Sequence, residues 1–251
     1  MTQKIIAVVN QKGGVGKTTT TINVAAQLAN DKNSILLVDL DPQGNATSGL
    51  GLAKEQAKQT TYDVLGGMPL ADAVQETHVA QLFVLPASAD LAGAEVELVG
   101  RTRREFALSQ ALQSAAYDYI IIDCPPSLGL LTINGLTAAS QVLIPVQAEY
   151  YALEGLSQLL NTIQAVRGST NPNINLLGIV LTMFDKRNSL SEQVQAEVRN
   201  YFGDKLFQTV IPRNVRLAEA PSYGRTIYEH DRWSKGARAY KALAKEVRDR
   251  A

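Results

Sequence analysis

Only one cysteine, Cys124, occurs among the 251 residues of this sequence. A single thiol cannot close an internal disulfide, and it cannot form the CxxC pair of a metal or redox site. An iron–sulfur cluster held within one chain is also excluded, because such a cluster needs several cysteine ligands. This low cysteine content fits the reducing cytosol, so we expect a cytoplasmic protein.

Long hydrophobic runs are also absent. The apolar run before Gln11 is only about six residues long, which is too short for the hydrophobic part of a signal peptide. The most apolar later stretch, 130–146, is interrupted by several polar residues and by Pro145. It cannot supply the roughly 20 apolar residues of a membrane span. The sequence therefore predicts a soluble chain without a targeting segment.

Charged residues make up only 19% of the chain, and the formal net charge is zero. With 45% hydrophobic residues, 18 glycines and 9 prolines, the composition excludes a disordered, collagen-like or coiled-coil protein. A chain of this length can bury a large core, and no stretch is biased enough to be an interdomain linker. We predict a single domain over residues 1–251.

The neutral total hides an uneven distribution of charge. Residues 1–181 hold 10 Lys and Arg against 15 Asp and Glu, which gives −5, and residues 182–251 hold 14 against 9, which gives +5. Ordinary surface variation is one explanation of this difference. A basic C-terminal face that binds a polyanion is the other.

Short β-branched runs alternate with longer amphipathic stretches along the chain. Several runs are apolar on both faces, as strands are when helices cover both sides of a parallel sheet. The sequence predicts one doubly wound α/β domain with a mostly parallel sheet and helices on both faces. We expect strands at 5–10, 34–40, 82–87, 119–123, 141–146, 176–183 and 208–212, and helices at 17–30, 102–116, 152–167, 190–201 and 236–249.

A glycine-rich segment, QKGGVGKTT at 11–19, follows the first expected strand and precedes a helical pattern. The backbone N–H groups of such a loop approach phosphate oxygens closely, which requires glycines, and Lys17 would neutralise the β and γ phosphates. Thr18 opens the helix with a hydroxyl that can bind Mg²⁺. The usual pattern has glycine where this chain has Gln11, and here Lys12 precedes the glycine pair. The segment predicts a P-loop NTPase type of nucleotide site.

Two aspartates follow strands whose carboxyl ends should meet at one edge of the sheet. Asp123 ends an apolar strand, where a carboxylate is costly unless a cation or hydrogen bonds stabilise it. We expect it to bind Mg²⁺ or a Mg²⁺-bound water opposite Thr18, with a helix cap or turn residue as the alternative. Asp41 would orient or deprotonate the water that attacks the γ phosphate, and an Asp-Pro turn with Pro42 is the alternative. Cys124 is best explained as a small packed residue.

These motifs resemble those of the ParA/MinD family of deviant Walker A ATPases. The loop KGGVGKT at 12–18 carries this resemblance. Four further segments resemble the short, chromosomal Soj type of ParA within the family: DLDPQGNATSGLG (39–51), IIIDCPPSLG (120–129), PVQAEYYALEGL (145–156) and IPRNVRLAEAPS (211–222). The resemblance extends over essentially the whole chain. It implies a Mg²⁺-dependent ATPase that hydrolyses ATP to ADP and phosphate.

The resemblance also implies roles for individual residues. Proteins of this family close a face-to-face homodimer around ATP, which would bring Lys12 to the phosphates of the partner's nucleotide and Gly13 to the dimer interface. It makes Asp41 the catalytic residue of switch I and Asp123 the Walker B carboxylate. The rest of the loop would contact the nucleotide (Gly14, Val15, Gly16, Lys17, Thr18 and Thr19), and Pro212 and Asn214, with Met183, would lie near the adenine.

ATP-bound dimers of this family bind double-stranded DNA without sequence preference, and a ParB-like (Spo0J-like) partner stimulates hydrolysis and releases them. The resemblance therefore implies chromosome or plasmid segregation, with association with the nucleoid in the ATP-bound state. It favours Arg187 and Arg216 as DNA contacts. The other basic candidates are Lys235, Arg238, Lys241 and Arg248, and each of the six is also explained as a solvated surface charge.

Two other functions compete with a partition ATPase. A MinD-like ATPase that positions cell division would need a C-terminal amphipathic membrane helix, whereas 236–251 carry only Tyr240, Leu243, Ala244 and Val247 on one stripe. Such a stripe is typical of a helix that packs on the core, so we expect no stable membrane anchoring. A DNA-binding module without enzyme activity would not need the predicted hydrolytic residues.

Overall fold

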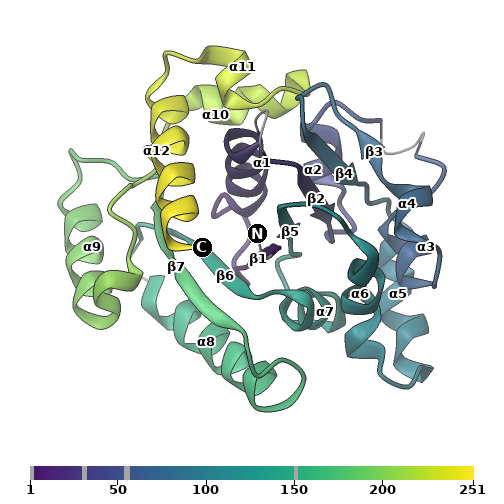
Figure 1. Cartoon of the computed structure of the whole chain (residues 1–251). Coiled ribbons are helices and arrows are strands. Elements are labelled where there is room, and N and C mark those ends of the chain that lie inside the picture. Colours follow the sequence, from purple (N-terminus) through teal and green to yellow (C-terminus); the bar gives the residue numbers. More distant parts are fainter. Residues whose placement is uncertain (1–2, 30–32, 54–56, 150–151) are drawn as a thin grey trace.

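The computed structural model describes residues 3–29, 33–53, 57–149 and 152–251. Within these ranges the strands form one seven-stranded sheet in the order β3-β4-β2-β5-β1-β6-β7 (Figure 1). Neighbouring strands are parallel except β3, which is antiparallel to β4. The strands are β1 (Lys4–Val8), β2 (Ile35–Asp39), β3 (Gln75–Glu76), β4 (Leu82–Leu85), β5 (Tyr119–Asp123), β6 (Gln141–Gln147) and β7 (Asn175–Thr182).

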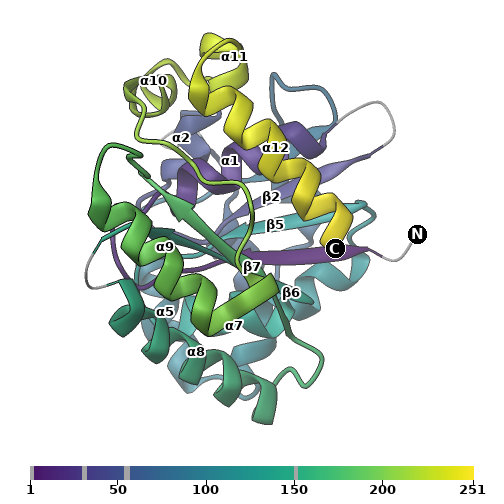
Figure 2. The ribbon, with the colours of Figure 1, turned by 90° about the vertical axis from the view of Figure 1, so that its left-hand side faces the viewer.

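Helices cover both faces of the sheet (Figure 2). No helix in the described ranges is both long and apolar enough to cross a bilayer. The α-helices are α1 (Lys17–Leu28), α2 (Asn45–Gly49), α3 (Thr61–Leu65), α4 (Leu70–Ala73), α5 (Leu91–Glu97), α6 (Ala107–Ala111), α7 (Leu130–Ala138), α8 (Ala152–Ser169), α9 (Ser189–Phe202), α10 (Val215–Glu219), α11 (Ile227–Asp231) and α12 (Lys235–Arg250). The short 3₁₀ helices are η2 (Leu98–Gly100), η3 (Arg104–Phe106), η4 (Leu112–Ser114), η5 (Gly203–Lys205) and η6 (Ala220–Tyr223).

Alternate residues of β1 belong to two hydrophobic layers, one on each face of the sheet. Ile6 packs with residues of α1, α2, α11 and α12, whereas Ala7 packs with residues of α7, α8 and α9. Both residues are fully buried. This arrangement follows from the period of two in a strand, and it explains why the strand runs are apolar at consecutive positions. The predicted doubly wound α/β fold is confirmed.

Two predicted elements are wrong. Residues 208–212 do not form a strand, because the Gln208 and Thr209 N–H groups bind the carboxylate of Glu246 and Pro212 has no N–H to donate. An isolated bridge between Phe184 and Pro212 and a hydrogen bond of 2.8 Å from the Ile211 N–H to the Leu181 carbonyl join this segment to the end of β7. The helix expected at 102–116 begins only at Arg104, because Arg103 adopts a left-handed backbone with φ 57°. From there it is divided into η3, α6 and η4. The last residue of the helix expected at 17–30 lies outside the described residues.

The C-terminal helix α12 packs against α1, the helix that follows the first loop (Figure 1). Its apolar stripe of Tyr240, Leu243, Ala244 and Val247 is buried, as predicted for a helix that packs on the core. The Tyr240 hydroxyl also shares a hydrogen bond of 3.1 Å with the Thr20 hydroxyl of α1. The end of the chain is therefore part of the layer that supports the glycine-rich loop.

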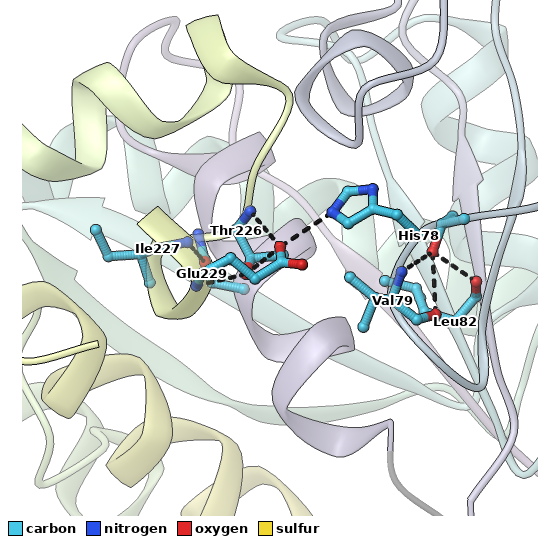
Figure 3. A network of polar contacts seen from close by, with 8 residues as sticks. His78, Val79, Leu82, Thr226, Ile227 and Glu229 are labelled. Carbon is cyan, nitrogen blue, oxygen red and sulfur yellow. Dashed lines mark hydrogen bonds and ion pairs between the residues drawn. The ribbon is translucent and has the colours of Figure 1, made fainter. Parts of the chain in front are cut away.

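A polar network joins the β3–β4 connection to α11 (Figure 3). The carboxylate of Glu229 accepts hydrogen bonds from the backbone N–H and the hydroxyl of Thr226, which caps α11. The same carboxylate lies 3.0 Å from Nε2 of His78, which is 151 positions earlier in the chain. The Glu229 side chain thus links α11 to the β3–β4 connection at the edge of the sheet.

Candidate active site

The carboxyl ends of three central strands place two carboxylates side by side. Asp39 ends β2 and Asp123 ends β5, and these two residues are direct neighbours in the parallel register. Val8, at the end of β1, is the neighbour of Asp123 on its other side. The glycine-rich loop leaves β1 at this point, at the centre of the sheet edge where ligands of doubly wound folds bind.

The loop of residues 11–19 takes a shape that only glycine adopts readily. Gly14 and Gly16 have positive φ values of 73° and 86°, and Gly16 caps the start of α1. Side chains from other elements hold the loop: the Thr182 hydroxyl donates to the Val15 carbonyl at 2.8 Å, and the Asn10 side chain accepts from the Lys12 N–H at 2.9 Å. The first turn of α1 lines the adjoining cavity, and the first N–H groups of a helix have no partner within it, as in anion sites at helix N-termini.

Two threonines of α1 bind the carboxylate of Asp123. The Thr18 hydroxyl donates to Oδ2 at 2.8 Å, and the Thr21 hydroxyl donates to Oδ1 at 2.9 Å. Burial, together with repulsion from Asp39, raises the pKa of Asp123, and the two hydroxyl donors oppose that shift. A cation beside Thr18 would stabilise the charged form of Asp123, because nearby positive charge favours a carboxylate.

The donor set around Thr18 fits Mg²⁺ bound together with a nucleotide. Mg²⁺ prefers hard oxygen ligands and usually takes only one or two from the protein, with phosphate oxygens and waters completing its shell. The Thr18 hydroxyl and the Asp123 carboxylate are such oxygens. Within the described part of the chain, no group of three or more His, Cys, Asp or Glu side chains could hold a metal alone.

Lys17 brings the positive charge of the site. Its side chain is only 6% exposed, and its ammonium donates to the Lys12 carbonyl at 3.2 Å. Burial lowers the pKa of Lys17, and the nearby carboxylates of Asp123 and Asp41 oppose that shift. A buried ammonium between a phosphate loop and two carboxylates is placed to neutralise an incoming anion.

Asp41 lies on the turn that follows β2, at the side of the same pocket. Its side chain is 6% exposed, and its Oδ1 accepts the Gln43 N–H at 2.9 Å. Asp39, two positions earlier, is fully buried and binds both the N–H and the hydroxyl of Thr47 in α2. Burial raises the pKa of Asp39 to about 6. The Asp39 carboxylate thus anchors the turn that carries Asp41.

Two adjoining cavities open at the loop. The first, of about 410 Å³, is lined by Gly13, Gly14, Gly16, Lys17, Thr18, Thr19 and Asp41, with residues of α2. The second, of about 440 Å³ and more apolar, is lined by Pro212 and Asn214 with Ile211, Val215 and Leu217. Met183 and Gly16 line both cavities. A polar compartment beside an apolar one suits a nucleotide, with phosphates in the first and a base in the second.

Lys12 projects away from these cavities toward β6. Its ammonium forms an ion pair of 2.6 Å with Glu149, and both side chains are about half exposed. Sequence reasoning missed Glu149 as its partner. An exposed ion pair of this kind is weak and can exchange, so Lys12 remains available to another anion.

The six basic candidates lie on the surface. The helices α9, α10 and α12 lie on one side of the molecule (Figure 2), and Lys235, Arg238, Lys241 and Arg248 lie on the exposed face of α12. Arg187, in the loop before α9, is 91% exposed and pairs with Asp185 at 3.0 Å. Arg216 of α10 pairs with Glu219 at 2.8 Å. The sequence analysis omitted Lys245, which is exposed on the same helix.

Known proteins are similar to this chain in sequence and in fold. The AAA domain family matches residues 3–176. The chain is 57% identical over 247 residues to the sporulation initiation inhibitor protein Soj of Bacillus subtilis (strain 168), a match that covers 97% of this chain and 98% of that protein. This chain belongs to the ParA/MinD family. More narrowly, it belongs among the Soj and ParA partition ATPases.

Two further similarities extend the family assignment. This ParA/MinD-family protein is 55% identical over 242 residues to the chromosome-partitioning ATPase Soj of Thermus thermophilus, a match that covers 96% of this chain and 94% of that protein. It also matches the crystal structure of cobyrinic acid a,c-diamide synthase from Mycobacterium smegmatis with bound ATP analog and magnesium. That match has a TM-score of 0.85 and 40% identity over 97% of this chain and 93% of that chain.

Sequence reasoning missed three supporting residues of this ParA/MinD-family site. Thr21 binds the Asp123 carboxylate, and Asp39 binds Thr47 of α2. Thr182, at the end of β7, binds the Val15 carbonyl of the loop. A signal for Thr21 was present, because it lies three positions after Thr18 and residues at that spacing share one helix face. Thr182 gave no such signal, since its partner Val15 is 167 positions away.

Proposed function

We propose that this chain is a partition ATPase that hydrolyses Mg²⁺–ATP as a switch for DNA binding. One observation carries the proposal: Lys17, Thr18 and Asp41 line a single cavity, with Asp123 bonded to Thr18 behind it. Phosphoryl transfer asks mainly for positioning and for stabilisation of charge, and these residues supply both. The neighbouring apolar cavity at Pro212 and Asn214 is proposed to receive the adenine.

Each residue of the proposed site has a separate task. The N–H groups of residues 13–19 bind phosphate oxygens, and the Lys17 ammonium neutralises the β and γ phosphates. Thr18 and Asp123 hold Mg²⁺, which neutralises phosphate charge when it is bound. Asp41 orients the attacking water and accepts its proton. This residue lines the cavity, and the Gln43 N–H holds its carboxylate in the turn after β2.

ATP would also close two subunits face to face. Lys12 exchanges its ion pair with Glu149 for the phosphates of the nucleotide bound to the partner, and Gly13 lies in the interface. Two features support this step. Lys12 is exposed at the end of the loop, and a Cβ added at Gly13 would meet no atom within 4 Å, so that position faces open space in the single chain.

The Gly13→Val variant should bind ATP as a monomer and fail to dimerise. Valine fits the single chain because the site is open and the φ of Gly13 is not left-handed, so ATP affinity should stay within about threefold. The added side chain obstructs close approach of two backbones. Light scattering with a non-hydrolysable ATP analogue measures the mass. Gly168→Val, another open position with ordinary φ, is the matched control and should dimerise. A normal dimer of Gly13→Val would remove Gly13 from the interface.

The ATP-bound dimer is proposed to bind double-stranded DNA without sequence preference. The helices α9, α10 and α12 lie on one side of the molecule (Figure 2). Arg187 precedes α9 and Arg216 belongs to α10, and with the exposed basic residues of α12 they fall in the segment that carries the +5 charge. A ParB-like partner would then stimulate hydrolysis and release the DNA. In this proposal residues 1–251 act as one domain, cytoplasmic and associated with the nucleoid when ATP is bound, in chromosome or plasmid segregation.

Charge reversal of Arg187 or Arg216 to Glu should weaken binding to every DNA by at least about tenfold at low salt. The slope of log affinity against log salt should fall by about 0.9 for each phosphate that the variant no longer neutralises. ATP-dependent dimerisation should persist, because neither residue lines the nucleotide cavities. Fluorescence anisotropy with labelled DNA and light scattering measure the two properties. Arg103→Glu, an equal charge change at an exposed residue of another segment, is the control and should keep DNA affinity. Loss of the dimer in either variant would assign that arginine to the interface.

Cosedimentation with plasmid DNA and with liposomes tests the function as a whole. The proposal predicts that the protein sediments with plasmid in ATP and stays soluble in ADP, and that a ParB-like partner raises ATP turnover. ATP-dependent sedimentation with liposomes and none with plasmid would instead indicate the MinD-like alternative. Equal DNA binding in ADP and ATP would refute the switch.

A further inference from the structure

A third cavity, of about 390 Å³, lies between α3, α4, η2 and α6. It shares no lining residue with the two nucleotide cavities. Its lining contains Arg101, Arg103 and Arg104 and no Asp or Glu. We call it the arginine pocket.

The arginine pocket is unexpected in this part of the chain. Residues 1–181 have a net charge of −5 and hold only 10 Lys and Arg, yet three of these fall at 101–104. Within the described residues, Arg104 pairs with Glu105 at 3.2 Å, whereas no carboxylate pairs with Arg101 or Arg103. Two of the three arginines of the pocket, Arg101 and Arg103, therefore have no carboxylate partner within the described residues.

Backbone carbonyl groups fix two of the guanidinium groups in place. Nη1 of Arg101 donates to the Leu65 and Gly66 carbonyls at 3.3 and 3.4 Å, and Nη1 of Arg104 donates to the Val99 carbonyl at 2.7 Å. Nη2 of each group is left without a described acceptor. Nε of Arg104 also donates to Glu105. The remaining nitrogen of each guanidinium can still give a charge-assisted hydrogen bond, which is how Arg binds carboxylates.

The third arginine occupies a strained backbone position. Arg103 has φ 57°, a left-handed conformation that residues other than Gly, Asn and Asp adopt rarely. Its guanidinium lies 5.0 Å from the centre of the Phe106 ring and makes no hydrogen bond to the described protein. Backbone strain at a residue with free donors is typical of binding sites.

Two exposed valines lie on the α5–η2 segment, which supplies Leu98 to the lining of the arginine pocket. Val96 is 75% exposed and Val99 is 59% exposed, and their spacing of three places them on one side of the α5–η2 segment. The carbonyl of Val99 is the group that binds Arg104. Exposed apolar side chains on the segment that borders the pocket, together with Arg101 and Arg103, form a mixed surface that a simple anion cannot cover.

We propose that the arginine pocket binds an acidic segment of a partner protein. Carboxylates of that segment pair with Arg101, Arg103 and Arg104, and an apolar side chain between them covers Val96 and Val99. The charge of the pocket requires an acidic partner, and the valines favour a peptide over a small anion. This binding needs neither ATP nor DNA, so its test is independent of the proposed switch.

Fluorescence anisotropy of a labelled acidic peptide, GELDDLEG, tests the proposal with the full chain. The peptide should bind more tightly at low ionic strength, and its amide analogue GQLNNLQG should bind at least about tenfold more weakly. Combined Arg101→Gln, Arg103→Gln and Arg104→Gln should weaken the acidic peptide by at least about tenfold. Combined Val96→Ser and Val99→Ser should weaken it by about threefold or more.

Two controls separate a specific site from general charge and from misfolding. Combined Lys241→Gln, Lys245→Gln and Arg248→Gln makes the same charge change on α12 and should leave peptide affinity within about twofold. Arg103→Gln alone removes no protein hydrogen bond, so it keeps the fold and should still weaken binding measurably. Equal weakening by the α12 variant, or equal binding of the amide peptide, would overturn the proposal. Binding of pyrophosphate without binding of the peptide would overturn it as well.

Discussion

We expect the Lys17→Ala variant to lose affinity for Mg²⁺–ATP by at least about 100-fold. The lost ammonium gives charge-assisted hydrogen bonds worth about 1.5–3 kcal/mol each, and tenfold in affinity corresponds to about 1.4 kcal/mol. No other basic side chain lines the polar cavity, so nothing in the described site replaces the charge. ATP-dependent dimerisation and DNA binding should disappear with it. Isothermal titration calorimetry with Mg²⁺–ATP measures the affinity.

Lys12→Ala is the matched control for this variant. Lys12 belongs to the same loop but pairs with Glu149 outside the cavity. Its loss should leave ATP binding by the monomer within about threefold, because the exposed ion pair contributes little. The dimer should be lost, since Lys12 is proposed to reach the nucleotide of the partner. Near-normal ATP affinity in Lys17→Ala would refute the phosphate-site assignment.

The Asp41→Ala variant should bind ATP normally and hydrolyse it about 10²–10⁴-fold more slowly, the usual range for removal of a general base. Asp41 borders the cavity, but it does not belong to the loop that holds the phosphates. The ATP-bound dimer should therefore accumulate. Phosphate release measures hydrolysis, and size-exclusion chromatography with ATP measures the dimer.

Asp41→Asn separates catalysis from the shape of the turn. The asparagine side-chain oxygen can still accept the Gln43 N–H that Asp41 binds at 2.9 Å, but the amide cannot accept a proton from water. Hydrolysis should fall as far as in Asp41→Ala, with an unchanged melting temperature. Normal turnover in Asp41→Asn would assign the base to another residue.

The sequence predicted most central strands because a strand that is buried on both faces has apolar residues at consecutive positions. A run such as IIID at 120–123 is apolar at consecutive positions, and the structure places it at the centre of the sheet. The QTVIP run at 208–212 also contains β-branched residues but forms no strand. The N–H groups of Gln208 and Thr209 bind Glu246, which is 38 and 37 positions away, and no local pattern reveals that contact.

Several short helices could not be predicted for a related reason. The helix α2 has the sequence NATSG, which contains mostly weak helix formers. It forms where the buried Asp39 carboxylate binds the Thr47 N–H, so a tertiary contact overrides local preference. At the site, the glycines and Lys17 gave a local motif, whereas Thr182, Glu149 and the arginine pocket depend on segments that only folding brings together.

The packing of α12 on α1 has a consequence for how a nucleotide could control DNA affinity. Tyr240 binds Thr20 and lines the apolar nucleotide cavity, while the opposite face of the same helix carries the basic residues. The orientation of those charges is thus already set by the core of the single chain. In the proposed switch ATP changes how many of these basic surfaces one particle carries, because the dimer has two of them. Once the first surface binds a DNA duplex, the second meets the same duplex at a high effective concentration.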